Sequence, residues 1–276
     1  AAGMSYFADR QEAYRHAAGV LPGARSIIVL TFPYAAAEHS PMPVGHGKIA
    51  RYVWDHADYH DVIHPKLKHL CQLIRDSHSG AQARGIVDTA PLMEREVAQL
   101  AGLGWRGKNT LLLNKRHGSY FFLACLLTDV ELPYDSPHES FHCGTCTDCL
   151  DACPTDAFPQ PGVLDATRCI SYLTIEHRDA IPIDLRAGIG QWLFGCDVCQ
   201  EVCPWNRKPS RAAIRPTDPL DQLNLRDLFS MDEDGFRQTF RKTPLWRTRR
   251  RGILRNAAIV LGNQRDDAAV AALTLG

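Results

Sequence analysis

Residues 143–154 read CGTCTDCLDACP and residues 196–204 read CDVCQEVCP, and with Cys169 between them they hold eight of the ten cysteines of the chain. Eight cysteines within 61 residues, separated by two or three residues in each run, are typical of metal or cluster ligation rather than of disulfides. Cys71 and Cys125 stand apart in apolar surroundings. We expect both to be core residues, because free cysteines are commonly buried.

The first cysteine run, which ends at Pro154, has the spacing of a bacterial ferredoxin. In that pattern three thiolates wrap one four-iron four-sulfur (4Fe-4S) cluster, and the cysteine before proline ligates a second cluster. The second run lacks its first cysteine because Leu193 stands there, and Cys169 can fill the gap. Crossed ligation then predicts one set of Cys143, Cys146, Cys149 and Cys203 and another of Cys153, Cys169, Cys196 and Cys199. Two structural zinc sites are the alternative.

Composition predicts a folded cytoplasmic protein. The chain has 276 residues, a formal net charge of zero and no charge-free apolar run of 18 residues, so we expect no membrane span. The start, AAGMSYFADR, lacks the features of a signal peptide. Residues 143–203 carry nine acidic against three basic residues, and residues 204–276 carry fourteen basic against eight acidic. An acidic middle therefore precedes a basic tail.

Residues 1–135 alternate between apolar strand-like runs and amphipathic segments, which predicts an α/β sandwich domain. Pro65 is acceptable in a helix only in the first turn. The expected elements are strands at 26–34, 85–90, 109–114 and 119–130 and helices at 61–78 and 94–101.

Residues 136–210 form the predicted ferredoxin-like domain, and residues 211–276 a short basic HEAT-like helical region. Thr243-Pro244 is a suitable start for a helix whose buried face we expect to contain five residues. A lone helical pair buries its face poorly without neighbours, so we expect the chain to be truncated at this end. The five expected face residues are Ile253, Leu254, Ala257, Ala258 and Leu261.

Asp88 closes a predicted strand among apolar neighbours, where a carboxyl group favours its protonated form and can donate a proton. The alternative is an Asp that caps the turn before Pro91. Arg95 is a candidate ion partner of Asp88 or a phosphate anchor.

The glycine-rich segment 102–110, GLGWRGKNT, allows close approach of a bulky ligand, with Lys108, Asn109 and Thr110 as hydrogen-bond donors. A tight turn between helix and strand is the alternative interpretation. His56, His60 and His64 are spaced four apart and could hold a metal, although a solvated helix face is favoured.

Several blocks, in this order along the chain, resemble the epoxyqueuosine reductase family. The resemblance covers almost the whole chain and includes the first cysteine run. The other blocks are ARYVW at 50–54, DYHDV at 58–62, VDTAPLMERE at 87–96, AGLGWRGKNTLLLN at 101–114, GSYFF at 118–122, CISYLTIEHR at 169–178, FGCDVCQEVCPWN at 194–206 and RRRGILRNAAIVLGN at 249–263.

The resemblance implies a cobalamin with its lower base displaced (base-off), two 4Fe-4S clusters that feed it electrons, and reduction of epoxyqueuosine to queuosine at the wobble position of tRNA. Asp88 would then be the proton donor. DxHxxG, the motif of cobalamin enzymes that supply a histidine to cobalt, is absent from the chain. The residues implied to contact cobalamin are Arg51, Asp88, Arg95, Lys108, Asn109, Thr110, Ser171, Gly195, Cys196, Asp197 and Val198.

The implied partners are tRNA and an external electron donor, for a monomeric protein. A group of arginines near the C-terminus supplies cations suited to phosphates. A reductive dehalogenase-like reductase is the alternative enzyme, and a ferredoxin-like electron carrier with affinity for RNA is the non-enzymatic alternative. The arginines are Arg247, Arg249, Arg250, Arg251 and Arg255.

Overall fold

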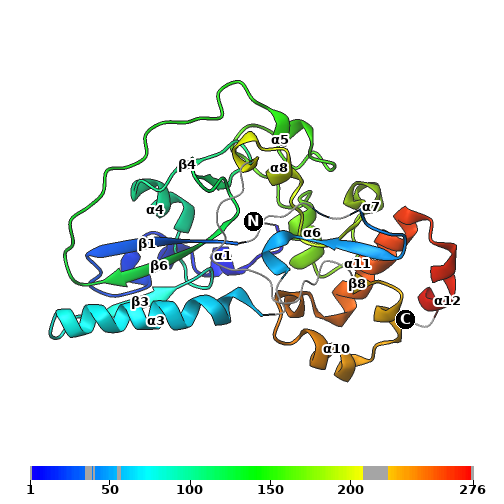
Figure 1. Ribbon diagram of the computed structural model, residues 1–276, viewed down its shortest axis with the longest axis horizontal. Helices are drawn as coiled ribbons and strands as arrows, with labels where there is room; N and C mark the ends of the chain where they lie inside the picture. The colour runs from blue at the N-terminus through cyan, green and yellow to red at the C-terminus, as the bar shows by residue number, and fades with distance from the viewer. Residues whose placement is uncertain (1, 35–38, 40, 55–56, 208–222, 275–276) are drawn as a thin grey trace.

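The computed structural model describes residues 2–34, 39, 41–54, 57–207 and 223–274. Its first layer is an antiparallel sheet in the order β1 (Ser26–Pro33), β6 (Phe121–Thr128) and β3 (Ala83–Ile86). Helix α3 (Tyr59–Ser77) lies along one face of this sheet and α4 (Glu94–Leu100) against the other (Figure 1). The predicted mixed α/β fold class is confirmed for this region.

Strand alternation explains the two covered faces. Leu126 packs toward α3 beside Cys71, whereas Leu123 packs toward α4 beside Ala98. Cys71 and Cys125 are free and buried, so the prediction that both are core residues is confirmed.

The predicted strand at 109–114 is wrong for most of its length. The chain forms a short hairpin of β4 (Trp105–Arg106) and β5 (Leu112–Leu113), and the intervening residues make the turn. The prediction that Pro65 lies in the first helical turn is also wrong. Helix α3 begins at Tyr59, after the side chain of Asp58 caps it, and Pro65 lies in the second turn. The missing N–H of Pro65 is tolerated on the exposed side of the helix.

A second sheet contains one strand from each of the three predicted regions, residues 1–135, 136–210 and 211–276. Strand β2 (His46–Ile49) pairs in parallel with β7 (Trp192–Phe194) and antiparallel with β8 (Leu223–Asn224). Ile49, Leu193 and Leu225 share the same buried core cluster. The early residues 46–54 therefore pack with later parts of the chain, and the predicted boundaries at 135 and 210 stay predictions.

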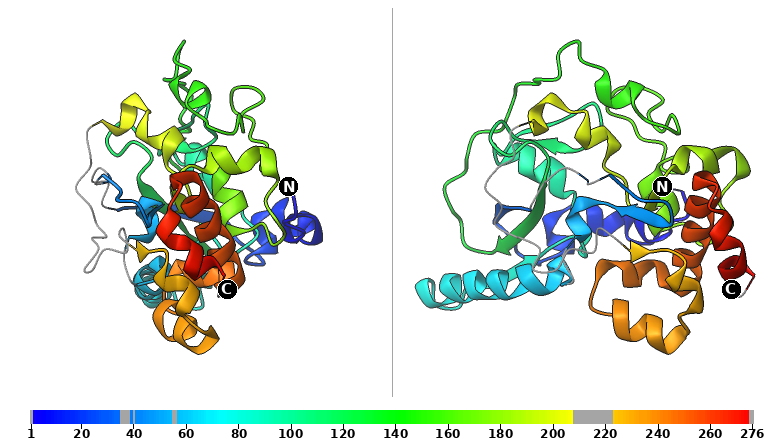
Figure 2. Two further views of the ribbon diagram at one scale, coloured as in Figure 1. Left: turned by 90° about the vertical axis from the view of Figure 1, so that its right-hand side faces the viewer. Right: turned by 45° about the vertical axis from the view of Figure 1, so that its right-hand side comes forward.

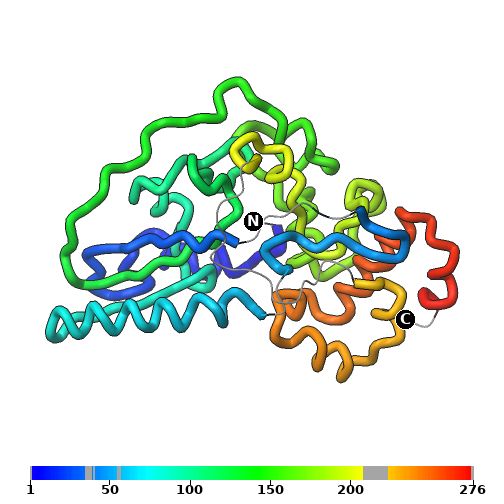
Figure 3. The backbone as a smooth tube through the Cα atoms, in the orientation of Figure 1, coloured from blue at the N-terminus to red at the C-terminus, as the bar shows by residue number. Residues whose placement is uncertain are grey.

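The cysteine-rich segment consists of short helices connected by turns: α5 (Asp148–Asp151), α6 (Ile170–Ile175), α7 (Ile183–Ile189) and α8 (Val198–Glu201). A long connection from β6 to α5 arches over the sheet side of the molecule (Figure 3). Irregular segments of this length in compact domains are usually functional. This one brings the first cysteines to α5, beside α8 (Figure 1).

The C-terminal region contains α9 (Asp227–Ser230), α10 (Glu233–Phe240), α11 (Arg249–Gln264) and α12 (Val270–Leu273). Residues Pro244–Thr248 form a 3-10 turn before α11, so the single helix predicted from Thr243-Pro244 is two elements. Helix α11 packs against β7, α6 and α7 (Figure 2). The expectation of a poorly buried face is therefore wrong. Of the five predicted face residues only Ala258 is not fully buried, and Asn256 and Val260 are buried in addition.

None of the described helices is both long and apolar enough to cross a membrane. The N-terminal α1 (Tyr6–Asp9) and α2 (Gln11–Tyr14) are short and have no buried residue.

Candidate functional site

The first predicted cysteine set lines one small cavity. Its volume is about 230 Å³, and its walls include Cys143, Cys146, Cys149 and Cys203. Burial, reinforced by the three neighbouring thiols, raises the pKa of Cys149 to about 11. Because thiolates rather than thiols bind iron, a cationic centre is needed to hold four deprotonated sulfurs together here.

The second predicted set lies next to the first. Cys199 has Cys169 and Cys153 among its electrostatic neighbours, and Cys196 has Cys199 and Cys169. The charge of Cys149, from the first set, also raises the pKa of Cys199, which shows that the two groups adjoin. Burial raises the pKa of the Cys169, Cys196 and Cys199 thiols. The folded chain thus offers two adjacent groups of four cysteines.

The spacing of these cysteines differs from that of a single-ion site. Within the part of the chain that the structure describes, no three His, Cys, Asp or Glu side chains are placed to share one metal ion. Zinc holds each thiolate at about 2.3 Å from one centre, whereas an iron–sulfur cube spreads its cysteines around a larger body.

A larger cavity of about 490 Å³ lies between the second cysteine group and the first sheet. This volume is in the usual range for small-molecule sites. Its wall is partly aromatic, with Tyr52, Tyr59 and Phe122 among the lining residues, and no described lining residue is a histidine. The predicted cofactor residues that line it are Asp88, Arg95, Asn109, Thr110, Ser171, Cys196 and Asp197.

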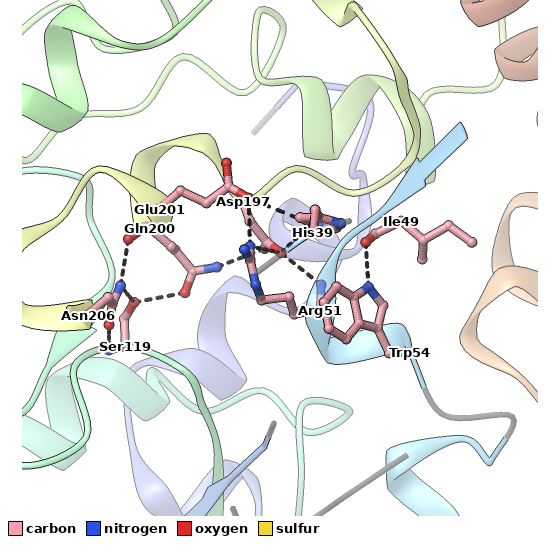
Figure 4. Close-up of polar contacts among 9 residues, drawn as sticks. All are labelled: His39, Ile49, Arg51, Trp54, Ser119, Asp197, Gln200, Glu201 and Asn206. Atoms are coloured by element: carbon pink, nitrogen blue, oxygen red, sulfur yellow. Dashed lines mark hydrogen bonds and ion pairs between the residues drawn. The ribbon is translucent and has the colours of Figure 1, made fainter. Parts of the chain in front are cut away.

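Arg51 does not line this cavity but supports the loop that does. Its backbone N–H donates to Asp197 Oδ2 at 2.7 Å, and its Nη1 lies 3.2 Å from the same oxygen and 2.7 Å from Glu201 Oε1. Gln200 Nε2 donates to Asp197 Oδ1, and His39 Nε2 lies within 4 Å of both carboxylates (Figure 4). These contacts hold the loop between Cys196 and Cys199 in place through residues, such as Arg51, that do not line the larger cavity.

Arg51→Met is expected to destabilise the folded protein by about 3–5 kcal/mol, because it leaves the buried Asp197 carboxylate without its cation. Thermal unfolding of the cluster-loaded variant measures the effect. Adding Asp197→Asn removes the stranded charge and should recover part of the loss. Equal stability of Arg51→Met and the parent chain would contradict this account.

Lys108 and Asn109 also hold the cluster loops rather than acting alone on a ligand. Lys108 Nζ donates to the carbonyl oxygens of Gly144 and Cys146 at 2.8 and 2.9 Å. The next residue, Asn109, donates from Nδ2 to the Cys199 carbonyl at 3.3 Å. The β4–β5 turn therefore ties the first cysteine group to the second, and Lys108 lines only the smaller cavity.

The remaining predicted loop residues, Gly195 and Val198, shape the loop without lining the larger cavity. Gly195 has φ +69°, and a Cβ there would lie 2.5 Å from the Ala50 Cβ, so a side chain is excluded. Val198 begins α8 and is partly buried. Gly195 thus lets the backbone of the loop pass close to Ala50, the residue after β2.

Asp88 stands at the larger cavity in a polar setting, so the expectation of apolar neighbours is wrong. Its side chain is 56% exposed, and its backbone has a positive φ of +60°. Tyr59 Oη donates to Asp88 Oδ2 at 2.7 Å, and Arg247 Nη1 lies 3.6 Å from that oxygen. Glu94 Oε1 accepts from the Asp88 backbone N–H at 2.9 Å. The strained backbone is thus held in one orientation from three sides.

Tyr59, Glu94 and Arg247 are site residues that sequence reasoning missed. The DYHDV and VDTAPLMERE blocks contain the first two, but nothing in them reveals a contact with Asp88. Arg247 was interpreted as a phosphate contact. The described ion partner of Asp88 is Arg247, not Arg95, whose Nη1 donates to the Thr110 carbonyl at 2.8 Å.

Glu94 titrates near neutral pH. Burial raises its pKa from 4.5 to about 7, against the opposing hydrogen bond from the Asp88 N–H. Between these values the folded chain binds a proton that the unfolded chain has lost. The contribution of Glu94 to stability is therefore fully present below about pH 4.5 and is lost as the pH rises through about 7.

Glu94→Gln should remove this pH dependence. Relative to the variant, the parent chain should lose on the order of 2 kcal/mol of stability between about pH 5 and about pH 8. Unfolding of both proteins at several pH values gives the comparison. A constant difference between them across this range would show that Glu94 does not titrate there.

The predicted histidine face is only partly solvated. His60 is half-buried, with Nδ1 2.7 Å from Asp58 Oδ1 and 3.0 Å from Arg247 Nη2. Its ring stacks 5.8 Å from His64, which is exposed, and His56 lies outside the described residues. His60 thus belongs to the polar network around Asp88.

Comparison with known proteins gives two family matches. Residues 15–89 match the family described as "Epoxyqueuosine reductase QueG, DUF1730", and residues 142–206 match the "4Fe-4S double cluster binding domain". A relative in Cyclobacterium marinum, named epoxyqueuosine reductase, is 42% identical over 260 residues, which cover 93% of this chain and 83% of the relative.

The chain belongs to the epoxyqueuosine reductase family. An epoxyqueuosine reductase solved with an epoxyqueuosine-modified tRNA-Tyr stem loop is 32% identical, with a TM-score of 0.85 over 98% of this chain and 76% of that one. The Bacillus subtilis epoxyqueuosine reductase, solved with its catalytic aspartate loop swung out of the active site, has a TM-score of 0.86 at 32% identity over 96% and 71% of the two chains. The predicted family, fold class and 4Fe-4S clusters are confirmed, whereas the ligand sets and cobalamin contacts stay predictions.

In this epoxyqueuosine reductase family member the C-terminal arginines have different tasks. Arg255 donates to the carbonyl groups of Leu173, His177 and Asp179, and Arg250 to that of Met231. These two arginines hold the fold together. Arg249, stacked 4.4 Å from the Trp246 ring, and Arg251 are exposed. They are the members of the predicted group that stay accessible to phosphates.

Proposed function

We propose that this chain reduces epoxyqueuosine to queuosine at the wobble position of tRNA, with electrons delivered through two 4Fe-4S clusters to a base-off cobalamin. One observation carries the proposal. The same cavity is lined both by Cys169, Cys196 and Cys199 of the second cysteine group and by Asp88. An electron source and a proton source thus meet at one site.

The described residues fit a base-off cobalamin. The cavity has aromatic and aliphatic walls, polar groups at Asn109, Thr110 and Ser171, and no histidine among its described lining residues that could ligate cobalt. When bound and reduced, cobalamin supplies low-potential electrons close to an epoxide carbon. The adjoining cysteine groups give a short path for these electrons, because the second group lies at the cavity wall.

Asp88 would donate a proton to the epoxide oxygen. Tyr59 and Arg247 hold its carboxylate toward the cavity, and the positive φ of Asp88 keeps the backbone turned for this contact. Removal of the oxygen as water, with a carbon–carbon double bond left behind, consumes two electrons and two protons. The Bacillus subtilis relative was solved with its catalytic aspartate loop swung out of the active site, and the Asp88 loop would be the counterpart of that loop. Tyr59, Glu94 and Arg247 would hold the Asp88 loop in its inward position.

The RNA would approach from the side of the basic tail. A modified base inside a stem loop has to be turned out of its stack to reach an enclosed cavity. Arg249 and Arg251 would hold phosphates through salt-dependent contacts. An external electron donor, a monomeric state and a cytoplasmic location complete the proposal.

The function is tested by expressing the chain in a bacterium that lacks its own epoxyqueuosine reductase. Mass spectrometry of nucleosides from its tRNA should show queuosine in place of epoxyqueuosine. Persistent epoxyqueuosine, despite folded and cluster-loaded protein, would contradict the proposal. Chloride release from an aryl halide by the purified chain would instead support the reductive dehalogenase-like alternative.

The cofactor is tested separately by electron paramagnetic resonance. Cob(II)alamin bound to the chain should give a spectrum without nitrogen coupling from a lower ligand. A spectrum with coupling to one nitrogen would show either a bound base or a histidine ligand, and would contradict the base-off assignment.

A further inference from the structure

The proposed deoxygenation needs two protons, and Asp88 holds only one. The first opens the epoxide to a hydroxyl group, and the second allows that hydroxyl group to leave as water. Two electrons balance the charge. A second proton source must therefore act at or behind Asp88 in each turnover, an argument that rests on the proposed function.

Glu94 is placed to be that source. It begins α4, lines the larger cavity together with Asp88, and accepts the Asp88 backbone N–H at 2.9 Å. The two carboxyl groups thus belong to one turn of chain and face one cavity. Among the described residues the Glu94 side chain makes no other hydrogen bond, so the group has hydrogen-bonding capacity left for a water or for the Asp88 carboxyl group.

The groups around Glu94 allow it to be protonated at neutral pH. Burial is the largest influence and raises its pKa to about 7. The Asp88 charge contributes to this rise, whereas the Asp88 N–H, Arg95 and His60 oppose it. Cys125 of β6 is within electrostatic range of Glu94, and burial keeps that thiol neutral by raising its pKa to about 12. A sizeable fraction of Glu94 therefore carries a proton at pH 7.

The two side chains that contact the Asp88 carboxylate, Tyr59 and Arg247, are poor proton donors. Burial raises the pKa of the Tyr59 hydroxyl, and the nearby Asp88 charge raises it further. Arg95 and Arg247 are guanidinium groups, which do not release a proton at neutral pH.

We propose that Glu94 is the proton reserve behind Asp88. After Asp88 has protonated the epoxide oxygen, Glu94 passes its proton to the Asp88 carboxylate, which then protonates the hydroxyl group as it leaves. Solvent reprotonates both carboxylates after water departs. Glu94 thus acts through Asp88 and needs no contact with the substrate.

Glu94→Gln tests the proposal, because glutamine keeps the acceptor for the Asp88 N–H but cannot release a proton. Glu96→Gln is the matched control, because Glu96 is a half-buried neighbour on α4 that pairs with Arg106. In the loaded enzyme we expect kcat of the Glu94 variant to fall by about 10²-fold, with cluster content unchanged. In the parent and control proteins kcat should fall as the pH rises above about 7. The pH profile of the Glu94 variant should lack this alkaline limb.

Two outcomes would overturn the proposal. One is wild-type kcat in the Glu94 variant. The other is a lower kcat with the alkaline limb retained, which would indicate a structural role only. If the parent chain makes no queuosine, the proposed function itself fails.

An infrared measurement without substrate or cobalamin keeps the two failures apart. Spectra recorded below and above pH 7 should show loss of a protonated carboxyl band in the parent and in Glu96→Gln but not in Glu94→Gln. The same band change in Glu94→Gln would assign the titration to another group and overturn the inference even if the enzyme is active.

Discussion

Replacing Cys169 by serine is expected to remove one cluster and abolish turnover. Cys169 lies far from both cysteine runs in sequence but adjoins Cys153, Cys196 and Cys199 in the fold and lines the larger cavity. Iron content should fall from about eight to about four atoms per chain, because each cluster holds four. Without the cluster beside the cavity, electrons have no short path to the reacting centre.

Cys71→Ser is the matched control. Cys71 is a buried residue of α3 that packs against the first sheet and belongs to neither cysteine group, so the variant should keep all its iron. Anaerobic purification, iron analysis and single-turnover assays give the comparison. Full iron content in Cys169→Ser would mean that another residue completes the second cluster.

Asp88→Asn is expected to lower turnover by about 10²–10⁴-fold while cobalamin and the clusters remain bound. Asparagine has the shape of aspartate and can accept the Tyr59 hydrogen bond, but it has no proton to give. The comparison of kcat with cobalamin affinity separates loss of chemistry from loss of binding. Asp61→Asn, at an exposed position on α3, is the control. Turnover within about twofold of the parent would refute a role for Asp88 as the acid.

Local patterns predicted the parts of this protein that depend on local chemistry. Cysteine spacing led to two sets that the fold brings into two adjoining groups, and short continuous apolar runs located β1 and β6. The hairpin at residues 105–113 was missed because its apolar run, TLLL, resembles a longer strand. Instead the chain reverses direction between β4 and β5, in a turn that contains Gly107 and is held by the Lys108 hydrogen bonds to the first cysteine loop.

Contacts between distant segments could not be read from the sequence. The parallel pairing of β2 with β7 joins residues more than a hundred positions apart, and it places Arg51 behind the cluster loop rather than at the cavity. In the same way Arg247 belongs to an arginine-rich run whose pattern suggests phosphate binding. Only the folded chain shows it beside Asp88.

The central claim is tested most directly with the purified chain. Protein loaded anaerobically with iron, sulfide and cobalamin is mixed with a reductant and a tRNA stem loop that carries epoxyqueuosine, and the digested RNA is examined by mass spectrometry. The account predicts a nucleoside lighter by one oxygen atom and identical to queuosine, formed only when cobalamin and reductant are both present. Unchanged epoxyqueuosine in the complete mixture, or conversion without cobalamin, would contradict it.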